Sequence, residues 1–144
     1  MKLRSIVSGT LVIVLAGVLG FAGALKLRDP AAFATDIENF QLLPAGPSAL
    51  FAVYLPWLEL LVAAGLLLPR WRSSAALLAT ALFAVFTVAV AAAMARGLDI
   101  TCGCFGHAAA TPLRWALLRD LVLLVAALSL LFLLKKPHSG ETRR

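Results

Sequence analysis

The sequence predicts an all-α membrane protein: a bundle of four transmembrane helices, with both termini in the cytoplasm and a short extracytoplasmic interfacial helix after the first span. Three observations lead to this fold class. The chain of 144 residues is 62% hydrophobic and 14% charged, whereas soluble domains are about 45–50% apolar and about 25% charged. Its apolar residues are gathered in four long runs. Lysine and arginine are unevenly distributed between the segments that join those runs.

Each apolar run is long enough to cross a bilayer, since a helix needs about 20 residues to span about 30 Å of hydrocarbon. We place the spans at about residues 5–26, 48–69, 73–95 and 113–134, in a single domain that covers residues 1–144. Helices are expected because backbone polar groups inside a bilayer must find partners within the protein. A water-soluble monomer of this composition would expose large apolar patches, so the lipid bilayer is the expected environment.

The distribution of basic residues sets the expected orientation, because cytoplasmic segments retain lysine and arginine during insertion. Eight of the 13 basic residues lie at the termini or in the Arg70-Trp71-Arg72 turn, with Glu141 as the accompanying acid. We therefore expect the termini and this turn in the cytoplasm, and residues 28–47 and 96–112 outside. The basic residues form short clusters, not a continuous face, so no nucleic-acid partner is expected despite the net charge of +6.

A cleaved signal peptide is the alternative interpretation of the first apolar run, because Ala22-Gly23-Ala24 is similar to a cleavage site. The run is longer than the usual signal core of about 7–15 residues. Ala16, Gly20 and Ala24 also form a stripe of small residues at four-residue spacing, which is typical of buried helix contacts in membranes. We therefore expect a retained first span.

A short interfacial helix is predicted after the first span. Asp29 is a favourable N-cap, and Pro30 suits the first helical position. Phe33, Ile37 and Phe40 would then share one face, with the polar residues of the segment on the other. We expect this helix to pack on the bundle as a lid.

Both cysteines of the chain lie in the second outer segment, within Cys102-Gly103-Cys104. The expected orientation places them outside the cytoplasm, where disulfides form and persist. A bridge between residues two apart needs a turn at Gly103, and closing so small a loop contributes only about 1.6 kcal/mol before strain is subtracted. Strained, exposed bridges are easily reduced. We therefore expect a reversible dithiol/disulfide pair.

Two other interpretations of this loop stay open. One is a passive bridge or a pair of inert thiols, and the other is metal binding by Cys102, Cys104 and His107. The metal site lacks a nearby fourth ligand, so we expect no resident metal. His107 is expected to be a solvated loop residue, and in its charged form it would also stabilise a neighbouring thiolate.

Besides Arg114 at the start of the fourth span, four charged residues lie within or at the end of the spans: Lys26, Glu59, Arg119 and Asp120. A charge in hydrocarbon costs at least about 2.5–3.5 kcal/mol, so each needs a partner or a polar cavity. All four lie in the outer half of the spans, beneath the cysteine loop. Arg119 and Asp120 are consecutive and point about 100° apart on a helix, so we expect them to have different partners.

Two interpretations of these four residues stay open as well. They form either a structural ion-pair cluster that fixes helix packing, or a proton-handling or ligand-binding pocket that serves the thiols. Pro56 lies one turn before Glu59 and can kink that helix, which would free a carbonyl toward the same region.

Four elements of the chain, in the same order, carry a resemblance to a known family: Gly23-Ala24-Leu25-Lys26-Leu27-Arg28-Asp29-Pro30, Leu55-Pro56-Trp57-Leu58-Glu59-Leu60, Cys102-Gly103-Cys104-Phe105-Gly106, and Arg119-Asp120. The chain resembles the methylamine-utilisation MauE/DoxX-like family of redox-associated integral membrane proteins. The resemblance implies a four-helix protein of the bacterial inner membrane. In the methylamine system, the family is thought to assist maturation of the periplasmic, disulfide-rich small subunit of methylamine dehydrogenase.

The sequence and this resemblance together predict an inner-membrane thiol–disulfide protein. Its redox pair exchanges with a periplasmic thiol/disulfide protein through a mixed disulfide. The candidate site comprises Cys102 and Cys104 as the redox pair, with Gly103, Phe105, Gly106, His107, Lys26, Glu59, Arg119 and Asp120 as auxiliary residues. Either a thiol–disulfide oxidoreductase or an accessory factor to one would fit.

Other functions stay open. A single cysteine pair disfavours a relay between two pairs, but it leaves direct electron transfer to a bound quinone open; no other cofactor is expected. The alternative function is a small-molecule or metal binding or transport protein that uses a polar pocket around Glu59. A third is a subunit that only scaffolds a larger complex. The oligomeric state is not determined by the sequence.

Overall fold

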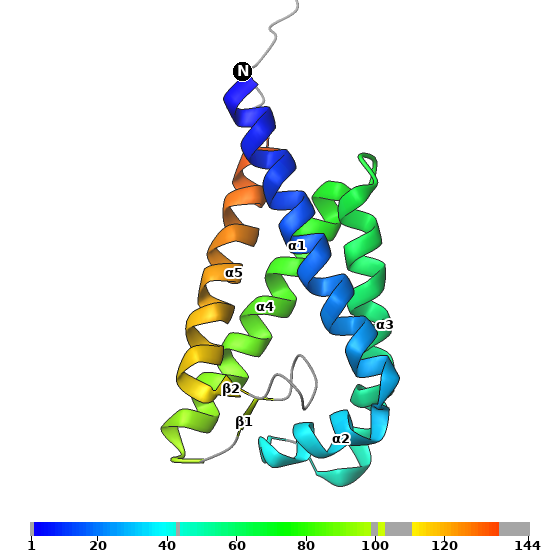
Figure 1. The fold of residues 1–144 in the computed structure, drawn as a ribbon, viewed down its shortest axis with the longest axis vertical. Helices are drawn as coiled ribbons and strands as arrows, with labels where there is room; N and C mark the ends of the chain where they lie inside the picture. The colour runs from blue at the N-terminus through cyan, green and yellow to red at the C-terminus, as the bar shows by residue number, and fades with distance from the viewer. Residues whose placement is uncertain (1, 43, 99–100, 103–110, 136–144) are drawn as a thin grey trace, which may run out of the picture.

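Four long helices form the body of the protein in the computed structural model, which describes residues 2–42, 44–98, 101–102 and 111–135. The long helices are α1 (Lys2–Arg28), α3 (Ala45–Leu67), α4 (Arg72–Ala95) and α5 (Leu113–Leu134). They run along the long axis of the molecule (Figure 1). All four are long and apolar enough to cross a membrane. The predicted four-helix transmembrane bundle is therefore confirmed.

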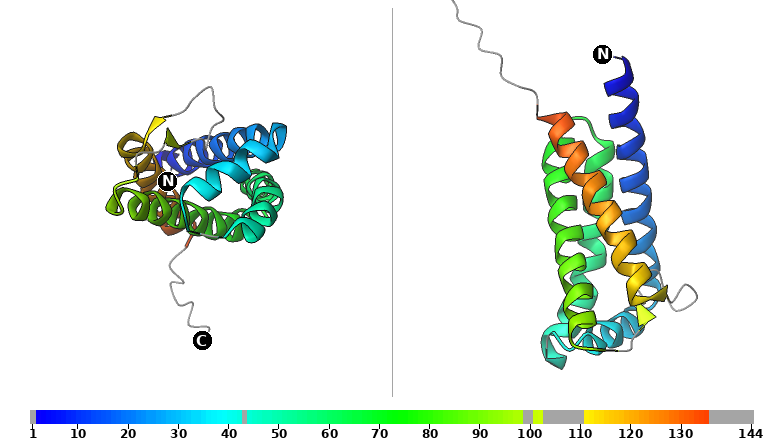
Figure 2. Two further views of the ribbon diagram at one scale, coloured as in Figure 1. Left: turned by 90° about the horizontal axis from the view of Figure 1, so that it is seen from below. Right: turned by 90° about the vertical axis from the view of Figure 1, so that its left-hand side faces the viewer.

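The shorter elements lie together at one end of the bundle (Figures 1 and 2). They are helix α2 (Pro30–Asn39) and the strands β1 (Thr101–Cys102) and β2 (Thr111–Pro112). The beginning of α1, the turn between α3 and α4, and the end of α5 lie at the opposite end. We call the end that contains α2 and the two strands the α2 end, and we call the opposite end the basic end. The basic end carries five described cations: Lys2, Arg4, Arg70, Arg72 and Lys135.

The bundle is built from two closely packed helix pairs. Helix α1 packs chiefly on α3, and α4 packs chiefly on α5, while smaller contacts between α3 and α4 and between α1 and α5 close the ring. Small residues allow these close approaches, as Ala76, Ala79 and Ala127 show by their complete burial. Apolar side chains also cover the outside, where Leu61 is 69% exposed and Phe132 is 71% exposed. An apolar exterior of this kind suits lipid.

Helix α2 begins as the sequence predicts. The side chain of Asp29 accepts a hydrogen bond from the backbone N–H of Ala32 at 2.9 Å, and Pro30 occupies the first turn. Phe33, on the apolar face, is buried. Helix α2 packs chiefly on α3. The lid-like helix expected after the first span is therefore present.

Arg96, just beyond the end of α4, attaches α4 to the C-terminal end of α2. Its guanidinium donates to the carbonyl oxygen of Phe40 at 2.6 Å and to that of Gln41 at 3.0 Å. Carbonyls at a helix C-terminus have no helical donors, so a cation there satisfies them and interacts favourably with the helix dipole. No sequence pattern indicates this contact, because Arg96 and Phe40 are far apart along the chain.

We expect Arg96→Ala to release the C-terminal end of α2 at a cost of about 1 kcal/mol, because both hydrogen bonds are exposed to solvent. Hydrogen exchange of residues 30–42 should become faster, while exchange within α5 should stay unchanged. Arg114→Ala removes another exposed cation at the same end and serves as the control. Unchanged exchange in α2 after Arg96→Ala would show that the contact does not hold the helix.

Candidate functional site

The cysteine segment joins the bundle through the short strand pair. Strands β1 and β2 are antiparallel, with Thr101 opposite Pro112 and Cys102 opposite Thr111. Thr111 and Pro112 lead directly into α5, so the backbone of Cys102 lies at the α2 end beside the start of that helix. The side chain of Cys102 lies outside the described part of the structure, as do its predicted redox partner Cys104 and the auxiliary residues Gly103, Phe105, Gly106 and His107.

Lys26 and Glu59 form a buried ion pair between α1 and α3. The Nζ atom of Lys26 lies 2.5 Å from Oε1 of Glu59, and the two side chains are only 3% and 1% exposed. Lys26 belongs to the last turn of α1, and Glu59 lies in the second half of α3. Because both charges are removed from water, each depends on the other for stabilisation.

Two aromatic rings complete the surroundings of the Lys26 ammonium. Its Nζ atom lies 5.1 Å from the ring centre of Phe33 on α2 and 5.0 Å from that of Phe86 on α4. A cation over an aromatic face is attracted by the negative charge of that face. Lys26 therefore brings together side chains from four helices at one point of the bundle.

A glycine allows α1 to approach α3 closely beside this ion pair. A Cβ atom at Gly23 would lie 3.0 Å from the backbone oxygen of Pro56, 3.2 Å from Cγ of Leu60 and 3.3 Å from Cβ of Glu59. Gly23 precedes Lys26 by three residues, so both lie on the same face of α1. The glycine thus sets the separation of the two helices at the level of the Lys26–Glu59 pair.

Arg119 and Asp120 pair with each other on α5, and the expectation that they have different partners was wrong in this respect. The Nε and Nη2 atoms of Arg119 lie 3.1 and 3.0 Å from Oδ1 of Asp120. The long arginine side chain can fold along the helix surface to its neighbour, despite the angle of about 100° between consecutive residues. The side chain of Asp120 is 5% exposed, and that of Arg119 is 28% exposed.

All four predicted intramembrane charges border one small polar cavity. Lys26, Glu59, Arg119 and Asp120 contribute to the lining of this cavity of about 20 Å³, and apolar side chains complete it. The sequence predicted that these residues lie at a similar depth in the membrane, but it did not predict which of them form pairs. It also missed Phe86, because a phenylalanine in an apolar span carries no local signal of such a contact.

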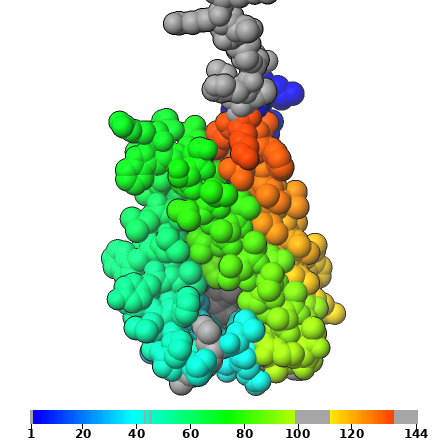
Figure 3. All heavy atoms as spheres, turned by 180° about the vertical axis from the view of Figure 1, so that it is seen from behind, coloured from blue at the N-terminus to red at the C-terminus, as the bar shows by residue number. Residues whose placement is uncertain are grey.

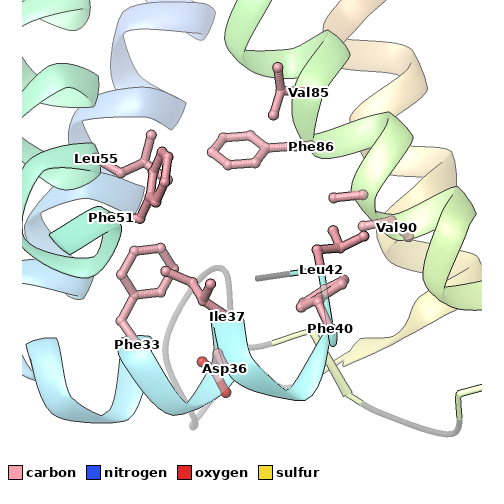
Figure 4. A pocket seen from close by; sticks show the side chains of 11 residues that line it. Phe33, Asp36, Ile37, Phe40, Leu42, Phe51, Leu55, Val85, Phe86 and Val90 are labelled. Atoms are coloured by element: carbon pink, nitrogen blue, oxygen red, sulfur yellow. The ribbon is translucent and has the colours of Figure 1, made fainter. Parts of the chain in front are cut away.

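A larger apolar pocket of about 310 Å³ lies on the other side of Phe86, between α2, α3 and α4. Its walls include Phe33 from α2, Phe40 directly after α2, Phe51 from α3, and Phe86 from α4 (Figure 4). Asp36 borders it but points away from its interior (Figure 4). The pocket lies where the surface is hollowed between α3 and α4, close to α2 (Figure 3). Its volume is within the range of about 300–1,000 Å³ that is typical of ligand pockets.

The apolar pocket also reaches toward the strand pair. Val90 and Phe40, which line the pocket, belong to an apolar cluster that includes Leu113 at the start of α5. Leu113 directly follows Pro112 of β2, and β2 pairs with the strand that contains Cys102. The cysteine segment and the apolar pocket therefore belong to the α2 end of the bundle, whereas the buried charges lie deeper in it, since Glu59 is in the second half of α3.

Comparisons with known proteins identify the family of this chain. The family described as "Methylamine utilisation protein MauE" matches residues 4–133. The chain belongs to the MauE family. The resemblance found in the sequence is thereby confirmed, and a multi-pass protein of the bacterial inner membrane fits both the family and the four apolar helices.

Three relatives, each named "Methylamine utilization protein MauE", show how far this similarity extends. The protein of Methylorubrum extorquens is 39% identical over 119 residues, which cover 81% of this chain and 64% of the relative. That of Paracoccus denitrificans is 40% identical over 116 residues, covering 78% and 62%. That of Methylophilus methylotrophus is 46% identical over 88 residues, covering 60% and 46%. This chain therefore spans about half to two thirds of the length of these relatives. No solved structure matches the chain significantly.

Proposed function

We propose that this protein acts in methylamine utilisation as an inner-membrane thiol–disulfide protein that assists maturation of a disulfide-containing periplasmic protein. The proposal depends on one observation above all: both cysteines of the chain lie in a single Cys-Gly-Cys sequence, whose first residue belongs to β1 at the α2 end of the bundle. The names of the relatives support the metabolic context.

The distribution of charge supports an outward-facing α2 end. Five described lysine and arginine residues lie at the basic end, where no described acid lies. At the α2 end, basic residues alternate with acids such as Asp29, Asp36 and Glu38. Because cytoplasmic segments are enriched in lysine and arginine, we place the basic end in the cytoplasm and Cys102 and Cys104 in the periplasm.

The chemistry that we propose is thiol–disulfide exchange with a periplasmic partner. A thiolate of the partner attacks one sulfur of a Cys102–Cys104 bridge, which breaks that bridge and forms a mixed disulfide. A second partner thiolate then attacks the mixed disulfide and leaves with a new disulfide. The partner loses two electrons, and Cys102 and Cys104 gain them as a dithiol. A small strained loop favours this direction, because strained bridges have more oxidising potentials.

Trapping of the mixed disulfide tests the proposal. Because thiol–disulfide exchange is reversible, the remaining thiolate of Cys104→Ser, or of Cys102→Ser if the other cysteine reacts, can attack a disulfide of the oxidised periplasmic partner. We expect the resulting covalent adduct to accumulate, since no second cysteine of this chain is left to resolve it. Non-reducing electrophoresis of membranes from cells grown on methylamine would detect the adduct, which reducing agent should remove. The double Cys102→Ser/Cys104→Ser variant is the control and should trap nothing. If neither single variant forms an adduct and both support growth on methylamine, the redox function is wrong.

The apolar pocket favours a second candidate function, the binding of an apolar small molecule. The polar cavity around Glu59 is only about 20 Å³, so it suits a species no larger than water. The pocket of about 310 Å³ beyond Phe86 has the size of a ligand site and apolar walls. If the protein binds an apolar molecule, Ala89→Trp should abolish activity because the large side chain fills the pocket. Glu59→Gln should also abolish activity, because it alters the polar cavity beside the pocket. Cys102→Ser should leave activity intact. The redox function predicts that Cys102→Ser abolishes activity.

A further inference from the structure

Two buried carboxylate oxygens, Oε2 of Glu59 and Oδ2 of Asp120, accept no hydrogen bond from any residue that the structure describes. The other oxygen of each group is paired, with Lys26 and Arg119 respectively. The side chains of Glu59 and Asp120 are only 1% and 5% exposed. An unsatisfied buried acceptor costs about 1–3 kcal/mol, and more when it is charged. Both oxygens therefore require a hydrogen-bond donor.

Both carboxylates border the same small polar cavity, which also touches Lys26 and Arg119. Its volume of about 20 Å³ exceeds the roughly 10–15 Å³ that one water molecule requires. A cavity of this size is too small for a metabolite or a lipid-derived group. A ligand at this position must therefore be the size of water and must donate hydrogen bonds.

The surrounding charges select a neutral ligand over an ion. Lys26 and Arg119 already balance Glu59 and Asp120, so a bound cation would leave an uncompensated charge inside the membrane. An anion would be repelled by the two carboxylates and would also leave an uncompensated charge. Water satisfies both conditions, since it carries two donors and no charge.

We propose that the cavity is a binding site for one water molecule, which donates to Oε2 of Glu59 and to Oδ2 of Asp120. This water joins the two helix pairs of the bundle, because Glu59 belongs to α3 and Asp120 to α5. It also turns two separate ion pairs into one network of carboxylate, water and carboxylate. Such a chain can accept and hold a proton within the membrane. The inference does not depend on the chemistry of the cysteines.

Oxidative footprinting in native membranes tests the proposal, using brief radiolysis in water enriched in the heavy oxygen isotope. Hydroxyl radicals formed from a bound water label the side chains that surround it. Leu19 borders the cavity and is 1% exposed, whereas Leu15 on the same helix is fully buried in the apolar core. We expect several-fold more labelling at Leu19 than at Leu15. Equal labelling of the two residues would overturn the proposal.

A pair of variants on α1 makes the test specific to the cavity. Ala22 lines the cavity, and Ala22→Val should fill it and reduce the labelling of Leu19 to the level of Leu15. Ala24, which is exposed on the same helix, provides the control, since Ala24→Val should leave the labelling of Leu19 unchanged. If sodium chloride in place of choline chloride suppresses the labelling of Leu19 in the wild-type protein, the site binds a cation and the proposal is wrong. If Ala22→Val does not fold, the comparison of Leu19 with Leu15 still decides.

Discussion

We expect Lys26→Met to lower the free energy of unfolding by about 3–5 kcal/mol, one of the largest effects of any single substitution in the described chain. The change leaves the fully buried Glu59 as an unpaired charge in the bundle. It also removes the cation from between the rings of Phe33 and Phe86. Thermal or denaturant unfolding of the purified protein in detergent, followed by tryptophan fluorescence, measures the change.

A second substitution separates the loss of the ion pair from the loss of packing. In Lys26→Met/Glu59→Met, no charge is left without a partner, and buried ion pairs are often replaced by apolar residues with little loss of stability. We therefore expect the double variant to regain most of the lost free energy. Arg28→Met removes an exposed cation from the end of the same helix and should have little effect. A double variant as unstable as Lys26→Met would show that the charge is not the cause.

The sequence predicted the fold well because the membrane imposes strong local requirements. Four apolar runs of about 20 residues have few alternatives to helices in a bilayer. The start of α2 was equally clear, because Asp29 and Pro30 act through contacts within one helical turn. The shared depth of Lys26, Glu59 and Asp120 followed from counting residues along each span. All of these features depend on local chemistry.

The sequence could not predict which side chains meet across the bundle. The expected stripe of small residues included Ala24, which is exposed, whereas its neighbour Gly23 is buried against α3. Nearly every position of α1 is apolar, so its pattern does not distinguish the face toward α3 from the face toward lipid. A shift of one residue rotates the contact by about 100°. The pairing of Arg119 with Asp120 and the position of Phe86 likewise depend on packing.

The contact at Gly23 leads to the second large effect. A Cβ atom at this position would lie only 3.0 Å from the backbone oxygen of Pro56, and a backbone atom cannot move aside as the tip of a flexible side chain can. Overpacking of a tight interface typically costs about 1–3 kcal/mol. The added atoms would also push α1 away from α3 at the level of Lys26 and Glu59. The cost therefore includes strain on the buried ion pair.

We expect Gly23→Ala to destabilise the protein by about 1 kcal/mol and Gly23→Val by about 3 kcal/mol, measured by unfolding in detergent. Gly20→Ala is the matched control, because its Cβ would meet only Cβ of Ala63 at an ordinary 3.8 Å. Both alanine variants gain the same helix propensity of about 0.5–1 kcal/mol, so their difference in stability isolates the contact with α3. Gly20→Ala should therefore stabilise the protein. If Gly23→Ala stabilises it as much, α1 and α3 are not in close contact at the ion pair, and the geometry that brings Lys26 to Glu59 is wrong.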